Sequence, residues 1–250
     1  MREPCSTATV ARGAATSRPR ATPTVRELGL LPYATALAMQ EALAAGNASG
    51  ENGDEILLLE HPPVYTLGRG ADAADLQGAP ERLGVPVHRV GRGGGATFHG
   101  PGQMVAYPIV RLRAAGRDVH AYVRSLEAAL IATCAHFGVS AEAPSGQTGV
   151  WADGRKLASI GIGVRRGVAY HGVALNVTTD LTFFAHIVPC RTSGLAVVNL
   201  ADLLGWSPSL VEVGRVFAAC LIERLHSNES VSPFLPPVSI SANGGGIGSS

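Results

Sequence analysis

Residues 149–177 read GVWADGRKLASIGIGVRRGVAYHGVALNV, and this stretch decides the fold. Its apolar runs are separated by two turn signals, Asp153-Gly154 and the RRG run at residues 165–167. An Asp-Gly pair between apolar runs is a strong hairpin signal, because both residues tolerate the backbone of a tight turn. The stretch therefore predicts consecutive antiparallel strands joined by short turns.

Helices and further strands are predicted on either side of this stretch. The clearest helix covers residues 119–137, where apolar side chains recur at spacings of three and four and Gly138 follows as a helix end. Further helices are expected at 32–45 and 210–225, and strands at 55–60, 85–90 and 104–112. Pro108 suggests that the last strand is an edge strand or is irregular. Hairpins mixed with helices predict an α/β (α+β) domain with a mixed sheet.

Composition limits the classes of partner. The chain has 250 residues, of which 46% are hydrophobic, and its 20 basic and 19 acidic residues leave a net charge of +1. We therefore expect neither a nucleic acid nor an anionic membrane as the main partner. There is no uninterrupted apolar run of the length that spans a bilayer, so no transmembrane helix is predicted.

The two ends differ in composition from the middle. Residues 1–24 are rich in Arg, Ser, Thr and Ala, which favours a disordered extension and leaves a transit segment as the alternative. Residues 227–250 are rich in Ser, Pro and Gly and are expected to be a disordered tail. One catalytic domain is predicted over residues 25–226.

The cysteines are sorted by their positions. Their spacing fits neither a zinc site nor a CxxC motif, which indicates reduced thiols. Cys134 and Cys220 fall on apolar helix faces and Cys5 in the N-terminal extension, whereas Cys190 follows Pro189 at the end of an element. Cys190 is therefore the candidate nucleophile.

A thiol nucleophile needs a nearby cation or base. Lys156 begins the run KLASIGIGV, where it shares a strand face with apolar residues. It is a candidate helper for the thiol; the alternative is a strand-end lysine that reaches water.

A glycine-rich segment, GRGGGATFHGPGQ at residues 91–103, is the candidate binding loop. Its start matches the dinucleotide pattern GxGxxA, but the Gly-Pro-Gly that follows cannot continue the helix which that motif opens. No second histidine stands at metal-ligand spacing from His99, so no metal site is expected. The alternative is a flexible connector.

Together these segments resemble one family, the octanoyltransferases of lipoate biosynthesis. The resemblance rests on EHPPVYTLGR (60–69), RGGGATFHGPGQMVAYPI (92–109), residues 149–177 and PC (189–190), and it covers about residues 25–225. It implies the mixed-sheet fold of biotin protein ligases and lipoate ligases. It also implies a two-step acyl transfer, in which octanoyl-acyl carrier protein donates the group and a lysine of a lipoyl-domain protein receives it.

The resemblance assigns roles residue by residue. Cys190 corresponds to the cysteine that takes up the acyl group as a thioester, and Lys156 to the lysine beside it. The substrate-contacting residues correspond to Arg92, Gly93, Gly94, Gly95, Ala96, Thr97, Phe98, His99, Ser159, Ile160, Gly161, Gly172, Val173 and Ala174. The chain departs from the family at Arg191, where a glycine is usual, and at Gly95-Ala96, where bulkier residues are usual and a wider acyl pocket is expected.

The resemblance also predicts the surroundings of the reaction. No ATP, metal or other cofactor is expected, because the thioester is already activated. The implied partners are acyl carrier protein and lipoyl-domain acceptors, namely the E2 subunits of 2-oxoacid dehydrogenases and the glycine cleavage H protein. A cytoplasmic monomer is expected, with organellar import if residues 1–24 are a transit segment. The alternatives are an ATP-dependent lipoate or biotin protein ligase, or an inactive module that binds the carrier or the lipoyl domain.

Overall fold

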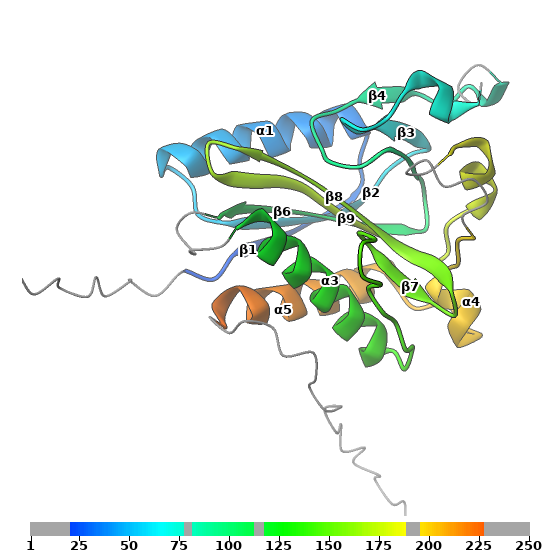
Figure 1. Cartoon of the computed structure of the whole chain (residues 1–250). Helices are drawn as coiled ribbons and strands as arrows, with labels where there is room; N and C mark the ends of the chain where they lie inside the picture. The colour runs from blue at the N-terminus through cyan, green and yellow to red at the C-terminus, as the bar shows by residue number, and fades with distance from the viewer. Residues whose placement is uncertain (1–20, 78–81, 113–117, 189–195, 228–250) are drawn as a thin grey trace, which may run out of the picture.

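A computed structural model describes residues 21–77, 82–112, 118–188 and 196–227 of the chain (Figure 1). Cys5, Cys190 and Arg191 lie outside the described residues, as do nearly all of the two predicted terminal extensions. None of the helices in these ranges is long and apolar enough to cross a membrane.

A six-stranded mixed sheet is the centre of the fold. Its strands are β1 (Thr24–Leu30), β2 (Glu55–Glu60), β6 (Gln103–Arg111), β7 (Val150–Ala152), β8 (Arg155–Arg165) and β9 (Val168–Asn176), in the order β1-β2-β6-β9-β8-β7. β1 and β2 are parallel, and the other neighbours are antiparallel. The predicted mixed α/β architecture is confirmed.

Both predicted hairpin turns are present. Asp153 and Gly154 have φ angles of 49° and 70° between β7 and β8, and Arg166 and Gly167 have φ angles of 51° and 82° between β8 and β9. Two successive residues with positive φ are the mark of a tight turn whose twist matches that of the strands it joins. Arg166 has a side chain and therefore ordinarily disfavours a positive φ. The pairing of β8 with β9 outweighs this backbone preference.

Helices cover both faces of the sheet because side chains alternate along its central strands. Leu57 and Leu59 of β2 pack towards α1 (Tyr33–Ser49), whereas Ile56 and Leu58 belong to the core on the other face. That second core is closed by α3 (Val119–His136), α5 (Leu210–His226) and the short α4 (Leu200–Leu204). Figure 1 shows α1 on one side of the sheet and α3 and α5 on the other.

A small second sheet lies beside the first. It has the order β4-β3-β5, from β4 (Val87–Arg89), β3 (Val64–Leu67) and β5 (Ala96–His99). The 3-10 helices η1 (Ala73–Leu76) and η3 (Leu181–His186) complete its core, and Tyr65 Oη donates to the Phe183 carbonyl at 2.9 Å. Four residues of the predicted glycine-rich loop, Ala96–His99, therefore form strand β5.

Pro108 marks an irregularity in the middle of the sheet. β6 lies between β2 and β9, and its paired register with β9 runs through Ala106 and resumes at Val110. Proline cannot donate to a ladder, so it stands where the ladder is interrupted. Opposite, a methyl group on Gly172 would collide with the Ala106 carbonyl and with Pro108 Cδ, so the two strands approach as closely as glycine allows. Of the two predictions for Pro108, the irregularity is confirmed and the edge position is wrong.

Candidate active site

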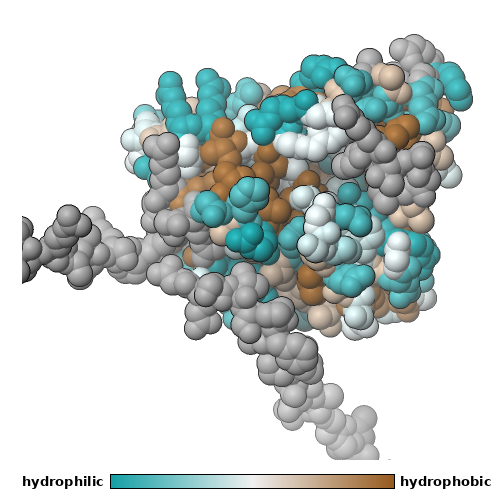
Figure 2. Space-filling view, viewed as in Figure 1, coloured by the Kyte–Doolittle hydropathy of each residue, from teal (hydrophilic) through white to brown (hydrophobic). Residues whose placement is uncertain are grey.

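One large cavity, of about 1130 Å³, opens between the glycine-rich loop, β8 and β9, the N-terminal half of α3 and the loop 143–148. Figure 2 shows apolar side chains at the surface over β8 and β9, between α1 and α3. Val164 is 38% exposed there, and Ile160 and Ile162 line the cavity. The cavity therefore combines an apolar wall with charged residues at its margins.

Most of the predicted substrate-contacting residues line this cavity. They are Arg92, Gly93, Gly94, Gly95, Ala96, Thr97, His99, Ser159, Ile160, Gly161, Gly172, Val173 and Ala174. Phe98 does not line it: the ring is 1% exposed and stacks on Phe183 at 4.5 Å between centroids, within the core of the small sheet. Alternation along β5 explains the difference, since Thr97 and His99 face the cavity while Phe98 faces the opposite side.

The glycine-rich loop lies directly on strand β8. Gly93 N donates to the Ile162 carbonyl at 2.8 Å, and a methyl group on Gly161 would stand 3.0 Å from both Gly93 O and Arg92 Cδ. On the other side, a methyl group on Gly68 would collide with the Gly94 carbonyl. Because Gly68 and Gly161 have no side chain, the segment at Gly68, the glycine-rich loop and strand β8 can meet backbone to backbone. Together they form the inner wall of the cavity.

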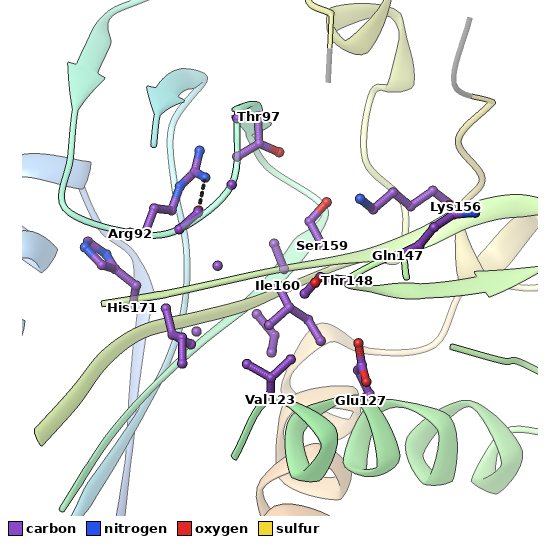
Figure 3. A pocket seen from close by; sticks show the side chains of 18 of the residues that line it. Arg92, Thr97, Val123, Glu127, Gln147, Thr148, Lys156, Ser159, Ile160 and His171 are labelled. Atoms are coloured by element: carbon purple, nitrogen blue, oxygen red, sulfur yellow. Dashed lines mark hydrogen bonds between the residues drawn. The ribbon is translucent and has the colours of Figure 1, made fainter. Parts of the chain in front are cut away.

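Arg92 is the anchor of this loop. Its side chain is buried, and its Nη2 donates to the Thr66 carbonyl at 2.8 Å and to Thr66 Oγ1 at 2.8 Å. Its Nη1 donates to the Gly93 carbonyl at 3.0 Å, as the dashed line in Figure 3 marks. These bonds join the loop to β3 and hold a positive charge at the inner end of the cavity.

Two neutral histidines lie behind the loop. His61 Nδ1 donates to the Leu31 carbonyl at 2.6 Å, so its Nε2 accepts from Tyr107 Oη at 2.8 Å. His99 Nδ1 donates to Gln103 Oε1 at 2.8 Å. Burial lowers the pKa of His61 to about 4. Burial and the neighbouring His61 lower the pKa of His99 to about 3. Both imidazoles are therefore uncharged at neutral pH.

His171 has an unusual environment for a histidine. It is 1% exposed, lines the cavity and adopts a φ of 59°, in the left-handed region. Its amide donates to Gln40 Oε1 at 2.9 Å, while neither ring nitrogen has a hydrogen-bond partner among the described residues. Burial, followed by the charge of Arg92, lowers the pKa of His171 to about 4. The ring thus presents an uncharged polar edge to the inner end of the cavity (Figure 3).

Lys156 lies at the other end of the cavity. The side chain is 8% exposed, and its Nζ stands 5.0 Å from the centroid of the Trp151 ring. Its amide donates to the Ala196 carbonyl at 2.8 Å, and its own carbonyl accepts from Val198 N at 3.1 Å. The side chain is largely buried and lines the cavity, and its role as a helper of the thiol stays a prediction.

Glu127 faces the cavity from α3. Together with Val119, His120, Val123 and Arg124 it forms the helix face that lines the cavity, at spacings of three and four residues. Its Oε1 accepts from Gly149 N at 3.4 Å. Burial raises the pKa of its carboxyl group, against the opposing effect of the Gly149 amide.

Cys134 is buried in the main core, as its helix pattern predicts, and burial raises the pKa of its thiol to about 12. Cys220 is partly exposed on α5, and burial also raises its pKa. Neither residue lines the cavity. Within the ranges that the structure describes, there is no group of three or more His, Cys, Asp or Glu side chains that could hold a metal ion.

Several cavity residues are not among those predicted from the sequence, although some of them stand within the quoted segments. Tyr33, Tyr107, Glu127 and His171 line the cavity, and His61 supports Tyr107 from behind. They come from α1, β6, α3 and β9, which only the fold brings together. A period-of-four stripe that includes a charged residue, as on α3, is the one sequence signal that could have indicated Glu127.

Comparison with known proteins agrees with this arrangement. The family model described as the lipoyl protein ligase A/B catalytic domain matches residues 32–222. An octanoyltransferase of Geobacter metallireducens is 48% identical over 216 residues, which cover 84% of this chain and 98% of that protein.

Two solved structures share the fold. The crystal structure of lipoate-protein ligase A bound with ATP has a TM-score of 0.69 at 19% identity, and the match covers 82% of this chain and 86% of that one. The biotin protein ligase from Aquifex aeolicus in complex with biotin and ATP has a TM-score of 0.51 at 13% identity, with 81% and 70% covered.

Proposed function

Because the chain belongs to the lipoyl protein ligase A/B catalytic-domain family, and within it to the octanoyltransferases, we propose that it transfers an octanoyl group onto a lysine of lipoyl-domain proteins. The donor is octanoyl-acyl carrier protein, and Cys190 carries the group as a thioester between the two partners. The acceptors are the E2 subunits of 2-oxoacid dehydrogenases and the glycine cleavage H protein. No ATP or metal takes part, because the donor thioester is already activated.

One observation supports this mechanism most directly. Lys156 is held inside the cavity, and its backbone is hydrogen-bonded on both sides to the segment 196–198. That segment begins six residues after Cys190 in the chain. The lysine and the chain that follows the cysteine are thus joined at one end of the cavity, as a dyad of these two residues requires.

The chemistry of the dyad follows from its residue types. Lys156 lowers the thiol pKa of Cys190 through its positive charge or, as the free amine, takes up the thiol proton. The Cys190 thiolate then attacks the carbonyl carbon of the donor, and the carrier thiolate leaves as its carbon–sulfur bond breaks. In the second step a lysine amine attacks the enzyme thioester, an amide forms, and the Cys190 sulfur is released. The amide is more stable than the thioester, so the second step drives the transfer.

The acyl chain fits the apolar wall of the cavity. Val123, Ile160 and Val173 line it between Lys156 and the glycine-rich loop. Each buried methylene contributes about 0.8 kcal/mol. Chains shorter than the optimum therefore lose affinity in even steps, and longer chains meet the wall that the glycine-rich loop forms where Gly93 lies against β8.

The test is the intact mass of the protein after it is mixed with octanoyl-acyl carrier protein in the absence of ATP. We expect a thiol-labile octanoyl adduct on Cys190, which is missing in a Cys190→Ser variant. Transfer that occurs only with free octanoate and ATP would instead identify a ligase. Neither adduct nor transfer under either condition would identify a binding module.

A further inference from the structure

Glu127 is the only carboxylate among the described residues that line the cavity. The other charged residues around it are cationic: Arg69, Arg92, Arg124 and Lys156. A cavity with this balance attracts anionic or neutral groups and repels cations. The second step of the proposed reaction nevertheless needs a lysine side chain, which arrives as an ammonium ion. The positive charge of the cavity therefore disfavours the acceptor ammonium ion unless a negatively charged group compensates for it.

The position of Glu127 is suited to that compensation. Gly149 separates it from Lys156: Gly149 N lies 3.4 Å from Glu127 Oε1, and a methyl group on Gly149 would stand 3.0 Å from Lys156 Cε. The two charged side chains thus both lie beside Gly149, at the same end of the cavity. Figure 3 shows Glu127 directed into the cavity from α3, while Lys156 and Ser159 enter from β8.

The backbone conformation of Gly149 and the atoms around it require a glycine at this position. Its φ is 137°, and a methyl group there would also stand 2.7 Å from the Ala158 carbonyl. No other residue type fits this backbone and this space. The missing side chain at position 149 thus lets the Lys156 side chain and the Ala158 carbonyl pack closely beside the residue that Glu127 contacts.

On the basis of the proposed function, we propose that Glu127 binds the ε-ammonium group of the acceptor lysine and takes one proton from it. A carboxylate forms a short, charge-assisted hydrogen bond to an ammonium ion. A partly buried carboxylate beside an amine is also placed to act as its base. Lys156 remains assigned to the thiol of Cys190, so each partner of the reaction has its own proton acceptor.

The proton balance of the second step is then complete. The ammonium ion gives one proton to Glu127, and the neutral amine attacks the thioester carbonyl carbon. The carbon–sulfur bond breaks, the amide keeps one of the two remaining nitrogen protons, and the other ends on the released Cys190 sulfur. An ammonium ion, a thioester and a carboxylate are consumed, and an amide, a thiol and a carboxylic acid are formed.

The test separates charged from uncharged nucleophiles. Wild type and Glu127→Gln are first loaded with octanoyl from the carrier protein, and the decay of each acyl-enzyme is followed by intact mass. The nucleophile is either N-acetyl-lysine methylamide, an ammonium ion at neutral pH, or hydroxylamine, which is uncharged there. Glutamine keeps the acceptor oxygen for Gly149 N and removes the charge. Glu142→Gln is the matched control, because Glu142 is exposed near the same loop and does not line the cavity.

We expect Glu127→Gln to load at the wild-type rate, to react with the lysine analogue about 10²-fold more slowly, and to react with hydroxylamine as wild type does. Glu142→Gln should match wild type with both nucleophiles. Equal slowing with both nucleophiles would show that Glu127 only supports the loop, and no slowing with either would show that it has no role; both overturn the proposal. Failure of wild type itself to form the adduct would count against the proposed function, and against the role of Glu127 with it.

Discussion

The amide of Lys156 donates a hydrogen bond of 2.8 Å to the carbonyl of Ala196, and this bond joins β8 to the chain that follows Cys190. The carbonyl of Lys156 accepts in turn from Val198 N at 3.1 Å. A side-chain substitution at position 156 leaves both bonds intact. The role of the amino group can therefore be tested without disturbing this connection.

Replacing Lys156 with methionine should slow thioester formation by about 10²- to 10⁴-fold, because in the proposed dyad the thiol of Cys190 loses its cation and base. The methionine fills most of the same space, so the circular dichroism spectrum should stay as in wild type. Arg155→Gln is the control, since Arg155 is the neighbouring cation and does not line the cavity. A Lys156→Met variant that forms the adduct at the wild-type rate would remove Lys156 from the mechanism.

The close approach of the paired strands β9 and β6 at Gly172 predicts a large effect of one methyl group. Gly172→Ala should lower the free energy of unfolding by about 1–3 kcal/mol, because its methyl group would collide with the Ala106 carbonyl. Gly53→Ala is the control, since nothing stands within 4 Å of a methyl group there. Urea denaturation of both variants measures the difference, and equal midpoints would show that β9 can move away.

The buried histidines predict a loss of stability in acid. In the folded state the pKa values of His61, His99 and His171 are about 4, 3 and 4, below the ordinary value of 6.5. Between these folded-state pKa values and 6.5, the unfolded chain thus binds more protons than the folded chain. The stability from the neutral histidines is fully present above pH 6.5 and is lost as the pH falls.

For every pH unit below 6.5, each of the three histidines should lower the free energy of unfolding by about 1.4 kcal/mol. Urea denaturation at pH 7, 6 and 5 measures the slope. His61→Gln should reduce that slope by about a third. His226→Gln should leave it unchanged, because His226 is exposed at the end of α5. An unfolding free energy that does not change between pH 7 and 5 would contradict the prediction.

The packing of Cys134 predicts a protected thiol. Burial raises its pKa to about 12, so almost no thiolate exists at pH 8. Iodoacetamide should leave Cys134 unmodified in the native protein and modify it after denaturation. Peptide mapping reads both states, and rapid native modification of Cys134 would show that the core between α3 and α5 opens readily.

Much of the fold could be predicted because its signals are local. The helix predicted at 119–137 is Val119–His136, and the strand predicted at 55–60 is Glu55–Glu60. Each carries its own periodicity or apolar run. β1 (Thr24–Leu30) was not predicted, because its side chains are mostly exposed on an edge strand that depends on β2 for its form.

The glycine-rich segment shows the limit of prediction from local sequence. Six glycines predict a permissive backbone, yet the middle of the segment, Ala96–His99, is strand β5, paired with β3 from Val64↔His99 to Leu67↔Ala96. Pairing across thirty residues outweighs the local preference for a loop. The placement of Phe98 in the core follows from the same pairing, and no property of the loop composition could have shown it.

The residues of the candidate site also divide into those that the sequence indicates and those that only the fold brings to the cavity. Arg92 and Lys156 stand within recognisable motifs, and their burial in one cavity is consistent with the roles predicted for them. Glu127 stands outside the motifs, and His171 stands within residues 149–177 without a role predicted for it. Glu127 is one charged residue on an amphipathic helix, and His171 one polar residue in an apolar strand. Their significance lies in distances that only the folded chain sets.

The neutral histidines have a consequence for the lifetime of a reactive intermediate. An enzyme thioester is lost to hydrolysis when a base activates a water molecule beside it. Water near His61 or His99 meets imidazoles whose basicity burial has suppressed and whose Nδ1 atoms are already engaged as donors. In the proposed mechanism, water at this inner end of the cavity thus meets no imidazole basic enough to take its proton, so hydrolysis of the acyl-enzyme from that side is suppressed.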